Sequence, residues 1–257
     1  MKVGDFYERK EIIHEVVEAK RSKICYNLIL DLITNKIASG RRNRILDIGC
    51  ADGSLVIKFK KHCETFGVDI SQNAVKMAKE AGINAYEVDV SSQKLPFQDE
   101  YFDIIYMGDV IEHLTNPDHA IKEVTRVLKW NGFLVLSTPN LAHWLSRLLL
   151  LLGMQPLFSE VSTAKTFGRG PRSYHFLPAG HLRLFTYKAL KEFLTYYRFN
   201  VVKVEGVNYE GLPKILIGID KILSKIPSLS SNVILVATKR VKSNRHQKDR
   251  LLSERAS

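Results

Sequence analysis

The sequence has few cysteines and no long apolar run, and each shortage argues against a class of protein. The three cysteines, Cys25, Cys50 and Cys63, form no C-x-x-C pair, which argues against a disulfide framework and against a zinc ribbon. The longest apolar run, 148–152, is too short to span a bilayer. The first fourteen residues are charged throughout and lack the apolar segment of a signal peptide. These features predict a cytoplasmic protein.

The charge is strongly basic but unevenly distributed. The net charge is +11, and the segment 239–257 holds seven basic residues, two acidic residues and no aromatic residue. Such a segment is typical of a solvated, disordered tail, and contact with anionic lipid or nucleic acid is the alternative. Nucleic acid is the weaker alternative, because basic residues interleaved with aromatic side chains would be expected for it.

Hydrophobic periodicity predicts alternating strands and helices after a helical N-terminal segment, 11–38. The predicted strands are 44–48, 64–69, 84–88, 102–107, 132–138, 200–205 and 232–238. The predicted helices are 53–61, 71–81, 117–129 and 186–197, with Ser71 and Asn116-Pro117 as helix starts. This pattern indicates the α/β class, with a doubly wound, mostly parallel seven-stranded sheet covered on both faces.

Two segments interrupt the alternation and are predicted to carry helices. Residues 140–185 contain an apolar helix at 141–152, and residues 207–231 contain a basic amphipathic helix at 212–226. Both insertions follow strands, and ligands of open α/β sheets bind beyond the carboxyl ends of strands. The helices therefore form a substrate cap, cover the domain core, or lie on a membrane surface.

A glycine-bearing turn, residues 49–54, follows the first predicted strand and brings backbone N–H groups close to a ligand. Asp69 ends the next strand, where a nucleotide-binding fold of this class places the acid that holds ribose hydroxyls. The turn lacks the third glycine of a dinucleotide fingerprint and the lysine of a phosphate loop, and its Asp52 would repel a pyrophosphate. We therefore expect an adenosine cofactor that is cationic and has no phosphate. S-adenosylmethionine is such a cofactor, and Asp47 suits its ammonium group.

Residues 45–54 resemble motif I of the class I S-adenosylmethionine-dependent methyltransferases, with Ala51 in place of one of the family's glycines. The resemblance is to the type 11 and ubiquinone-biosynthesis O-methyltransferase-like members. Further segments are similar to later motifs of the family in the same order: 67–71, 88–90, 102–114, 128–139 and 180–186. The resemblance covers residues 40–140 and 180–240. It implies a Rossmann-like methyltransferase domain at 41–240 with insertions 140–185 and 207–231, between an N-terminal helical region, 1–40, and a basic tail, 241–257.

The resemblance also implies a cofactor site residue by residue. Asp69 would accept both ribose hydroxyls, Asp89 would meet the adenine amino group, and Asp47 would frame the methionine end with the glycines. The implied cofactor contacts are Asp47, Gly49, Cys50, Ala51, Gly53, Asp69, Ile70, Asp89, Val90, Met107 and Gly108.

Asp109, Glu112 and His113 stand at i, i+3 and i+4, and would share one face if the segment were helical. Two carboxylates and an imidazole suit a divalent metal ion, and a similar Glu-x-x-Glu-His arrangement occurs in ubiquinone-biosynthesis O-methyltransferases and small-RNA 2′-O-methyltransferases, where metal dependence is known. A further ligand would come from one of three histidines: His143, His175 or His181. The alternative is that Glu112 and His113 form hydrogen bonds below the cofactor, without a metal.

Methyl transfer needs a base only if the acceptor atom holds a proton, as in a phenol or a sugar hydroxyl. His113 is the first candidate for that base and His181 the second. We expect transfer to a small-molecule or lipid-linked acceptor, with a hydroxyl oxygen favoured over carbon or nitrogen and with peripheral membrane contact as a possibility. The alternatives are an RNA methyltransferase and a non-catalytic protein that binds the cofactor.

Overall fold

The computed structural model describes residues 18–35, 42–169, 177–209 and 211–240. The predictions on residues 1–17, on His175 and on the tail 241–257 lie outside the described residues. In chain order the elements are α2 (Glu18–Asn35), β1 (Asn43–Ile48), η1 (Val56–Phe59), β2 (Cys63–Asp69), α3 (Gln72–Glu80), β3 (Asn84–Glu87), β4 (Phe102–Gly108), η2 (Ile111–His113), α4 (Pro117–Val127), β5 (Leu128–Pro139), α5 (Trp144–Leu151), α6 (Tyr187–Tyr196), β6 (Phe199–Val207), α7 (Lys214–Leu223) and β7 (Asn232–Lys239).

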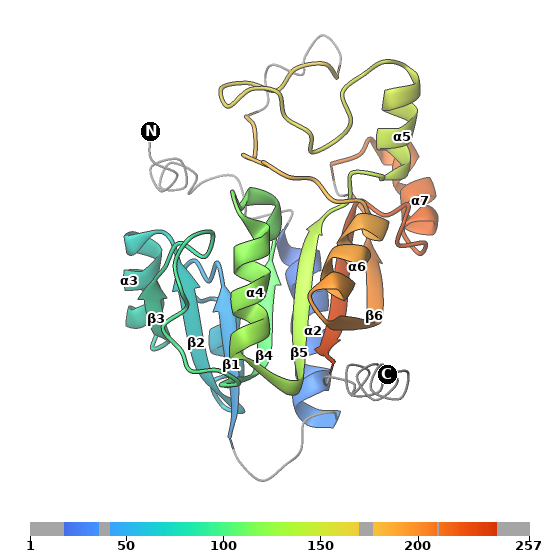
Figure 1. The fold of residues 1–257 in the computed structure, drawn as a ribbon. Coiled ribbons are helices and arrows are strands. Elements are labelled where there is room, and N and C mark those ends of the chain that lie inside the picture. The colour runs from blue at the N-terminus through green and yellow to red at the C-terminus, as the bar shows by residue number, and fades with distance from the viewer. Residues whose placement is uncertain (1–17, 36–41, 170–176, 210, 241–257) are drawn as a thin grey trace, which may run out of the picture.

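The strands form one sheet of seven in the order β3-β2-β1-β4-β5-β7-β6 (Figure 1). The pairs within β3-β2-β1-β4-β5 are parallel, and β7 lies antiparallel between β5 and β6. All seven predicted strands and the predicted fold class are confirmed. The central strands β1, β4 and β7 are buried along almost their whole length because both faces of the sheet are covered.

Each face of the sheet has its own apolar core. On one face the core joins side chains of α4 and α6, such as Ile121 and Leu190, to the sheet. On the other face it joins α2 and α3, through residues such as Ile29 and Val75. Figure 1 shows α4 and α6 in front of the sheet and α2 behind it. The helix α2 therefore belongs to the core of the sheet domain and is not a separate unit.

The predicted helix starts at α3 and α4 are confirmed. The Ser71 hydroxyl accepts a hydrogen bond from the backbone N–H of Ala74 at 3.2 Å, and the Asn116 side chain accepts one from His119 at 3.0 Å. These caps satisfy N–H groups that have no partner in the first helical turn. Pro117 opens α4, where its missing N–H costs nothing.

The predicted α-helix at 53–61 is wrong, because the chain forms only the short 3₁₀ turn η1 there. Val56 and Phe59 are fully buried in the same core. A 3₁₀ turn places residues i and i+3 on one side, so this short segment buries both side chains before the chain enters β2.

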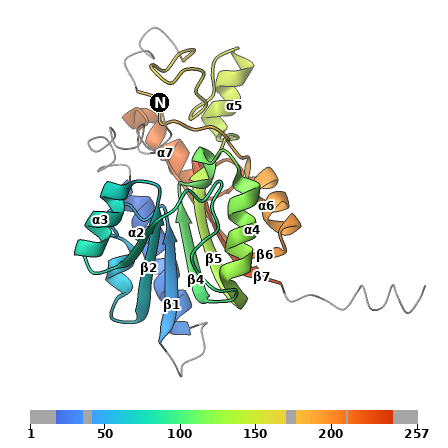
Figure 2. The same ribbon diagram turned by 60° about the vertical axis from the view of Figure 1, so that its left-hand side comes forward.

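The two insertions meet above the carboxyl ends of the strands, where Figures 1 and 2 place α5 and α7. At their bases, the backbone N–H of Asn140 donates to the carbonyl of Ser231 at 2.8 Å. Higher up, the His143 ring lies 2.9 Å from the Asp220 carboxylate, and both side chains are fully buried. None of the helices in the described part of the chain has the length and apolar content needed to cross a membrane.

Asp220 joins the two insertions through several donors. The indole N–H of Trp144 donates to Oδ1 of Asp220 at 2.7 Å, and the backbone N–H of Tyr209 donates to Oδ2 at 2.7 Å. Burial lowers the pKa of His143, and the Asp220 carboxylate only partly offsets this effect. We call α5, α7 and the contacts that join them the cap. It is held together by a buried polar cluster more than by apolar packing.

Candidate active site

The strands β1, β2 and β4 are neighbours in the sheet, and their carboxyl ends lie side by side. Ile48 pairs with Val68 on one side and with Met107 on the other. The turn that follows Ile48, the acid Asp69 and the glycine Gly108 therefore come together at the carboxyl ends of these strands. The predicted cofactor residues on these three strands are thus brought into one place.

The turn after β1 requires glycine at two positions. Gly49 and Gly53 have φ angles of +76° and +78°, a region that disfavours residues with a side chain. A Cβ atom on Gly49 would overlap the side chain of Val110, and one on Gly53 would overlap Ile83. Ala51 also lies in the left-handed region, with φ +46°, although it is not glycine.

Asp69 supports this turn as well as facing the ligand side. Its Oδ2 accepts a hydrogen bond from the backbone N–H of Ala51 at 3.0 Å, and its Oδ1 accepts one from Ser71 at 2.9 Å. The sequence analysis assigned Asp69 a ligand role and missed this structural one. A carboxylate has about four acceptor positions, so these bonds leave capacity for ribose hydroxyls.

Asp89 occupies a similar position one strand further along the sheet. It follows β3, and the backbone N–H of Val88 donates to the carbonyl of Asp69 at 2.9 Å. The carboxylate of Asp89 accepts from the backbone N–H of Ser91 at 2.9 Å and from the hydroxyl of Ser92 at 2.7 Å. These bonds fix the orientation of the carboxylate at the end of β3.

Asp47 is the most unusual acid of the site. Its side chain is only 3% exposed, and among the described residues its Oδ1 has no hydrogen-bond partner. Burial raises the pKa of Asp47 well above its ordinary value, and the charges of Asp69 and Asp52 add to this effect. A buried carboxylate oxygen without a donor fits a cationic ligand that brings its own N–H groups.

The remaining predicted contacts differ in what they can offer a ligand. Cys50 is buried beneath the turn, whereas Ile70 and Val90 are partly exposed at the strand ends. Met107 is fully buried in the core and could reach a ligand only through its backbone. A Cβ atom on Gly108 would overlap the ring hydroxyl of Tyr106, which keeps this position free of a side chain.

The helix that would place Asp109, Glu112 and His113 on one face is not formed. Asp109 has φ +51°, and only the short turn η2 follows it, so no α-helix runs through the segment. The Asp109 carboxylate forms an ion pair with Arg21 of α2 and accepts a hydrogen bond from the hydroxyl of Ser137 at 3.1 Å. The sequence contains no local signal for the contact with Arg21.

The structure instead brings His181 to Glu112 and His113. One ligand atom from each of the three residues lies within 4.8 Å of the others, and the two imidazole rings are 5.0 Å apart. The backbone carbonyl of Glu112 accepts hydrogen bonds from Leu182 at 2.8 Å and Arg183 at 2.9 Å, which ties the two segments together. Of the three histidines considered as a further ligand, His143 lies in the cap instead.

Backbone contacts orient both imidazoles. Nδ1 of His113 lies 3.0 Å from the carbonyl oxygen of Gly180, and Nδ1 of His181 lies 2.9 Å from that of Phe158. The Glu160 carboxylate accepts hydrogen bonds from three consecutive backbone N–H groups, those of residues 179–181. The sequence analysis missed Glu160, which stands in the long insertion without any motif around it.

Glu112 is a fully buried acid next to these imidazoles. Its Oε2 accepts a hydrogen bond from the Thr138 hydroxyl at 2.8 Å, and its Oε1 has no partner within the described residues. Burial raises the pKa of Glu112 well above its ordinary value, and the charge of Asp109 adds to it. The cluster of Glu112, His113 and His181 can therefore hold or move a proton, and its atoms also suit a divalent metal ion.

Comparisons with known proteins all identify methyltransferases as relatives of this chain. Residues 46–136 match a protein family described as a methyltransferase domain. The ubiquinone/menaquinone biosynthesis C-methyltransferase UbiE of Photorhabdus laumondii is 30% identical over 193 residues, which cover 66% of this chain and 69% of that protein. UbiE of Vibrio vulnificus is 29% identical over 175 residues, and the chain spans only 60% of its length.

The fold itself recurs among solved structures. A SAM-dependent methyltransferase from Thermotoga maritima, described as a possible histamine N-methyltransferase, has a TM-score of 0.55 and 19% identity. The similarity covers 93% of this chain and 100% of that one. At this level of identity the likeness establishes a common fold.

Proposed function

Because the chain belongs to the class I S-adenosylmethionine-dependent methyltransferases, we propose that it moves a methyl group to a hydroxyl-bearing small-molecule or lipid-linked acceptor. The observation that carries this proposal is the pair of imidazoles beside the buried Glu112, next to the cofactor turn. The backbone N–H of His113 donates to the carbonyl of Val110 at 2.9 Å, and Val110 lies against Gly49 of the turn. Val110 therefore connects His113 to the turn at residues 49–54.

The residues at the carboxyl ends of the strands fit S-adenosylmethionine. Asp47 offers an unpartnered carboxylate oxygen to the ammonium group, and Gly49 and Gly53 keep the turn free of side chains. Asp69 would hold the ribose hydroxyls, and Asp89 would face the adenine amino group. When bound, the sulfonium supplies an electrophilic methyl group, so the protein has mainly to position the acceptor in line with it.

The protein's own chemical task is to remove the acceptor's proton. In our proposal His113 takes this proton as the general base, and His181 is the second candidate. The carbonyl of Gly180 fixes the orientation of the His113 ring. The buried Glu112, whose raised pKa favours the protonated acid, adds little negative charge that would hold a proton on the imidazole.

The acceptor atom in our proposal is a hydroxyl oxygen. The relatives named above are C-methyltransferases, which makes a ring carbon beside a phenol hydroxyl the second candidate. Both reactions begin with loss of the hydroxyl proton, so the same base serves either one. Nuclear magnetic resonance of a ¹³C-methyl product distinguishes an O-methyl from a C-methyl group directly.

A divalent metal ion is the alternative use of Glu112, His113 and His181. In that case the ion would take an oxygen of Glu112 and nitrogens of both imidazoles, and it would lower the pKa of a bound hydroxyl. Base chemistry predicts that activity survives chelation with EDTA. Loss of activity with EDTA and recovery with Mg²⁺ or Mn²⁺ would favour the metal instead.

The decisive experiment supplies methyl-labelled S-adenosylmethionine and a cell extract to the purified protein. We expect label in material that partitions into organic solvent, and no label with the variant His113→Gln. RNase-sensitive label would identify an RNA methyltransferase, which the basic charge suggests as a second candidate. Binding of S-adenosylhomocysteine without any transfer would identify a non-catalytic binding protein and refute the proposal.

A further inference from the structure

The two cap helices bury polar residues and expose apolar ones. The one fully buried residue of α5 is Ser146, and that of α7 is Asp220. By contrast, Leu151 of α5 is 82% exposed and Ile215 of α7 is 85% exposed. The exposed apolar side chains of the cap are Leu148, Leu150, Leu151 and Leu152 with Ile215, Ile219, Ile222 and Ile226. A large exposed apolar surface on a folded domain indicates a binding surface.

The exposed residues of the second cap segment form two parallel stripes. Ile215, Ile219, Ile222 and Ile226 stand at i, i+4, i+7 and i+11, which places them along one side of α7 and of the turn that follows it. Lys214, Lys221 and Lys225 stand one residue before Ile215, Ile222 and Ile226, and all three are exposed. We call these the isoleucine stripe and the lysine stripe. An apolar side bordered by lysines is typical of helices that lie in a membrane interface.

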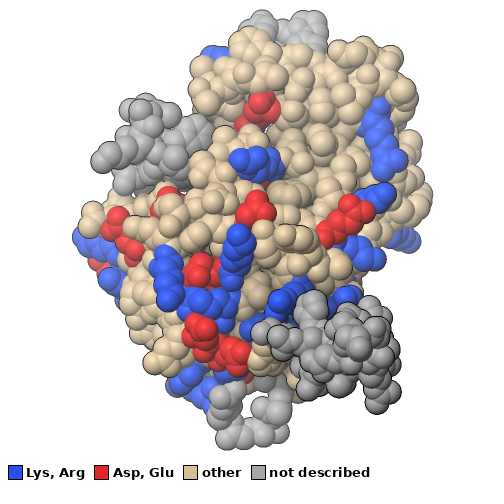
Figure 3. Space-filling model, in the orientation of Figure 1, with Lys and Arg blue, Asp and Glu red and all other residues tan. Residues whose placement is uncertain are grey.

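The surface of the cap is also free of negative charge over both helices. The helix α5 contains no acidic residue, and the one acid of α7, Asp220, is fully buried. Figure 3 shows fewer charged side chains in the upper part of the molecule, around α5 and the loop after it, than in the body below, which is dense in both signs. The cap therefore presents aliphatic side chains and positive charge together.

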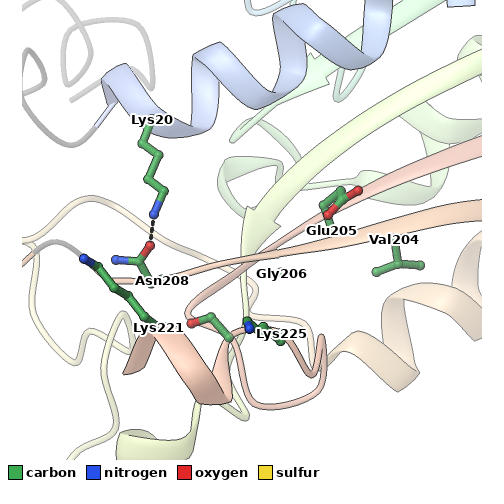
Figure 4. A pocket seen from close by; sticks show the side chains of 8 residues that line it. Lys20, Val204, Glu205, Gly206, Asn208, Lys221 and Lys225 are labelled. Atoms are coloured by element: carbon green, nitrogen blue, oxygen red, sulfur yellow. Dashed lines mark hydrogen bonds between the residues drawn. The ribbon is translucent and has the colours of Figure 1, made fainter. Parts of the chain in front are cut away.

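A pocket of about 300 Å³ opens beside the lysine stripe (Figure 4). It is lined by Lys20, Val204, Glu205, Gly206, Asn208, Lys221, Ser224 and Lys225. Three lysines and a single glutamate thus line the pocket. Lys20 donates a hydrogen bond to the side-chain oxygen of Asn208, and Glu205 lies 3.3 Å from Lys203 in an ion pair. The buried hydroxyl of Ser224 has no hydrogen-bond partner among the described residues. The donors and the charge of this pocket fit a phosphate group.

From these observations we propose that the cap docks on an anionic phospholipid bilayer. The isoleucine stripe and the exposed leucines of α5 enter the interface, while the lysine stripe contacts lipid phosphates and the pocket holds one headgroup. The cap lies above the carboxyl ends of the strands (Figure 1), so this orientation turns those ends towards the bilayer. The proposal depends on the surface alone, so its failure would leave the proposed methyl transfer standing.

A lipid surface fits the cap better than a second copy of the chain does. Protein interfaces are depleted in lysine and rely on aromatic and arginine anchors, whereas the exposed apolar side chains of the cap are leucine and isoleucine bordered by lysine. The cap also contains Trp144 and Arg147, but these donate hydrogen bonds within the cap, to Asp220 and to the carbonyls of Ala142 and Ser228. In a twofold dimer the same patch of each copy would meet, which would bring the two lysine stripes close together. Anionic headgroups neutralise those charges instead.

The test compares binding of the full chain to vesicles of phosphatidylcholine alone and of phosphatidylcholine with phosphatidylglycerol. We expect the protein to sediment with the vesicles that contain phosphatidylglycerol and not with those of phosphatidylcholine alone. The double variant Ile215→Gln/Ile219→Gln should lower the partition coefficient at least about tenfold, because two inserted aliphatic side chains are lost. The matched control is Met77→Gln/Tyr196→Gln, since these residues on α3 and α6 are 49% and 79% exposed against 49% and 85% for Ile219 and Ile215. Thermal unfolding checks that both variants are folded.

The lysine stripe gives a second measurement. Lys221→Gln and Lys225→Gln should each weaken anionic binding by about fivefold, and added salt should reduce the difference. The basic segment 241–257 is present in every variant, so it cannot account for these losses. The fluorescence of a polarity-sensitive label at Ile222→Cys should shift to the blue on vesicles, and that of a label at Tyr196→Cys should not. The three native cysteines are buried, so the label reacts with the introduced cysteine.

Three results would overturn the proposal. The first is absence of binding to either vesicle. The second is equal binding by the isoleucine double variant and the wild type, which would assign the contact to another surface. The third is a concentration-dependent dimer that dissociates in the isoleucine variant, which would make a second copy the occupant of the cap.

Discussion

We predict that the substitution Asp47→Asn raises the stability of the ligand-free protein and weakens cofactor binding. The Asp47 side chain is 3% exposed, and its Oδ1 has no hydrogen-bond partner among the described residues. Ionising a buried carboxyl costs free energy, and asparagine removes this cost because it carries no charge and keeps the shape of the side chain. We expect the free energy of unfolding to rise by ~1–2 kcal/mol, which corresponds to an increase in melting temperature of ~2–8 °C for a chain of this size.

The pH dependence of this gain has a defined sign. Burial raises the pKa of Asp47 in the folded protein above its value in the unfolded chain. Between these two values the folded protein binds more protons than the unfolded chain, so wild-type stability falls as the pH rises through that interval. Asparagine does not titrate, and the advantage of the variant should therefore grow with pH over the same interval.

Cofactor binding should change in the opposite direction. S-adenosylhomocysteine carries an ammonium group that would bind the ionised Asp47, and at a hundred times its Kd it should stabilise the wild type by ~2.7 kcal/mol. Loss of one charge-assisted hydrogen bond, worth ~1.5–3 kcal/mol, should lower the affinity of the variant by ~10-fold to 100-fold. Calorimetry and thermal unfolding, with and without the ligand between pH 6 and pH 9, measure both effects.

Asp103→Asn is the matched control. Asp103 is also buried, at 6% exposed, but it accepts a hydrogen bond from the backbone N–H of Arg44 at 2.9 Å and pairs with Lys129 at 2.7 Å. Its substitution should therefore lower stability. The reasoning is refuted if Asp47→Asn also lowers the melting temperature, or if the variant keeps the full shift with S-adenosylhomocysteine.

Four further outcomes are expected. Asp69→Ala should abolish the rise in melting temperature with S-adenosylhomocysteine, and NAD should give no rise with the wild type; a wild type that shifts with NAD would contradict the cofactor assignment. His113→Gln should lower kcat by ~10²-fold to 10⁴-fold while calorimetry shows unchanged S-adenosylhomocysteine binding; weaker binding would make His113 a structural residue instead. Asp220→Ala should cost ~3–5 kcal/mol in denaturant unfolding, because it leaves a buried imidazole, an indole and a backbone N–H without their acceptor. Since burial lowers the pKa of His143 below that of the unfolded chain, wild-type stability should also fall as the pH drops below about 6.5, and a flat profile would contradict this.

The strands and the well-capped helices could be predicted because their signals are local. The central strands contain short apolar runs, and the caps at Ser71 and Asn116 stand directly before their helices. The helix predicted at 53–61 is wrong because a local signal was the only guide there. Its apolar spacing suits a helix, but the packing of Val56 and Phe59 against the sheet decides the conformation, and that packing depends on residues far away in the chain.

The same distinction holds for the candidate site. The turn and the acids at strand ends could be predicted, because a strand–turn–helix order dictates where they meet. The partners that complete the site are distant in sequence, as with Arg21 and Asp109 or His113 and His181. The helical spacing of Asp109 and Glu112 misled the sequence analysis, because a residue at positive φ interrupts the segment.

The antiparallel strand β7 has a consequence for the order of folding during synthesis. It lies between β5 and β6, and within the described residues β6 is an edge strand whose one partner is β7. Until the ribosome has passed Lys239, β5 keeps an open hydrogen-bonding edge and β6 has no neighbour in the sheet. The nascent chain would therefore carry β1 to β5 as a half-finished sheet while about a hundred further residues are made. An open edge of this kind is a template for pairing with other chains, so the chain is exposed to aggregation until β7 is in place.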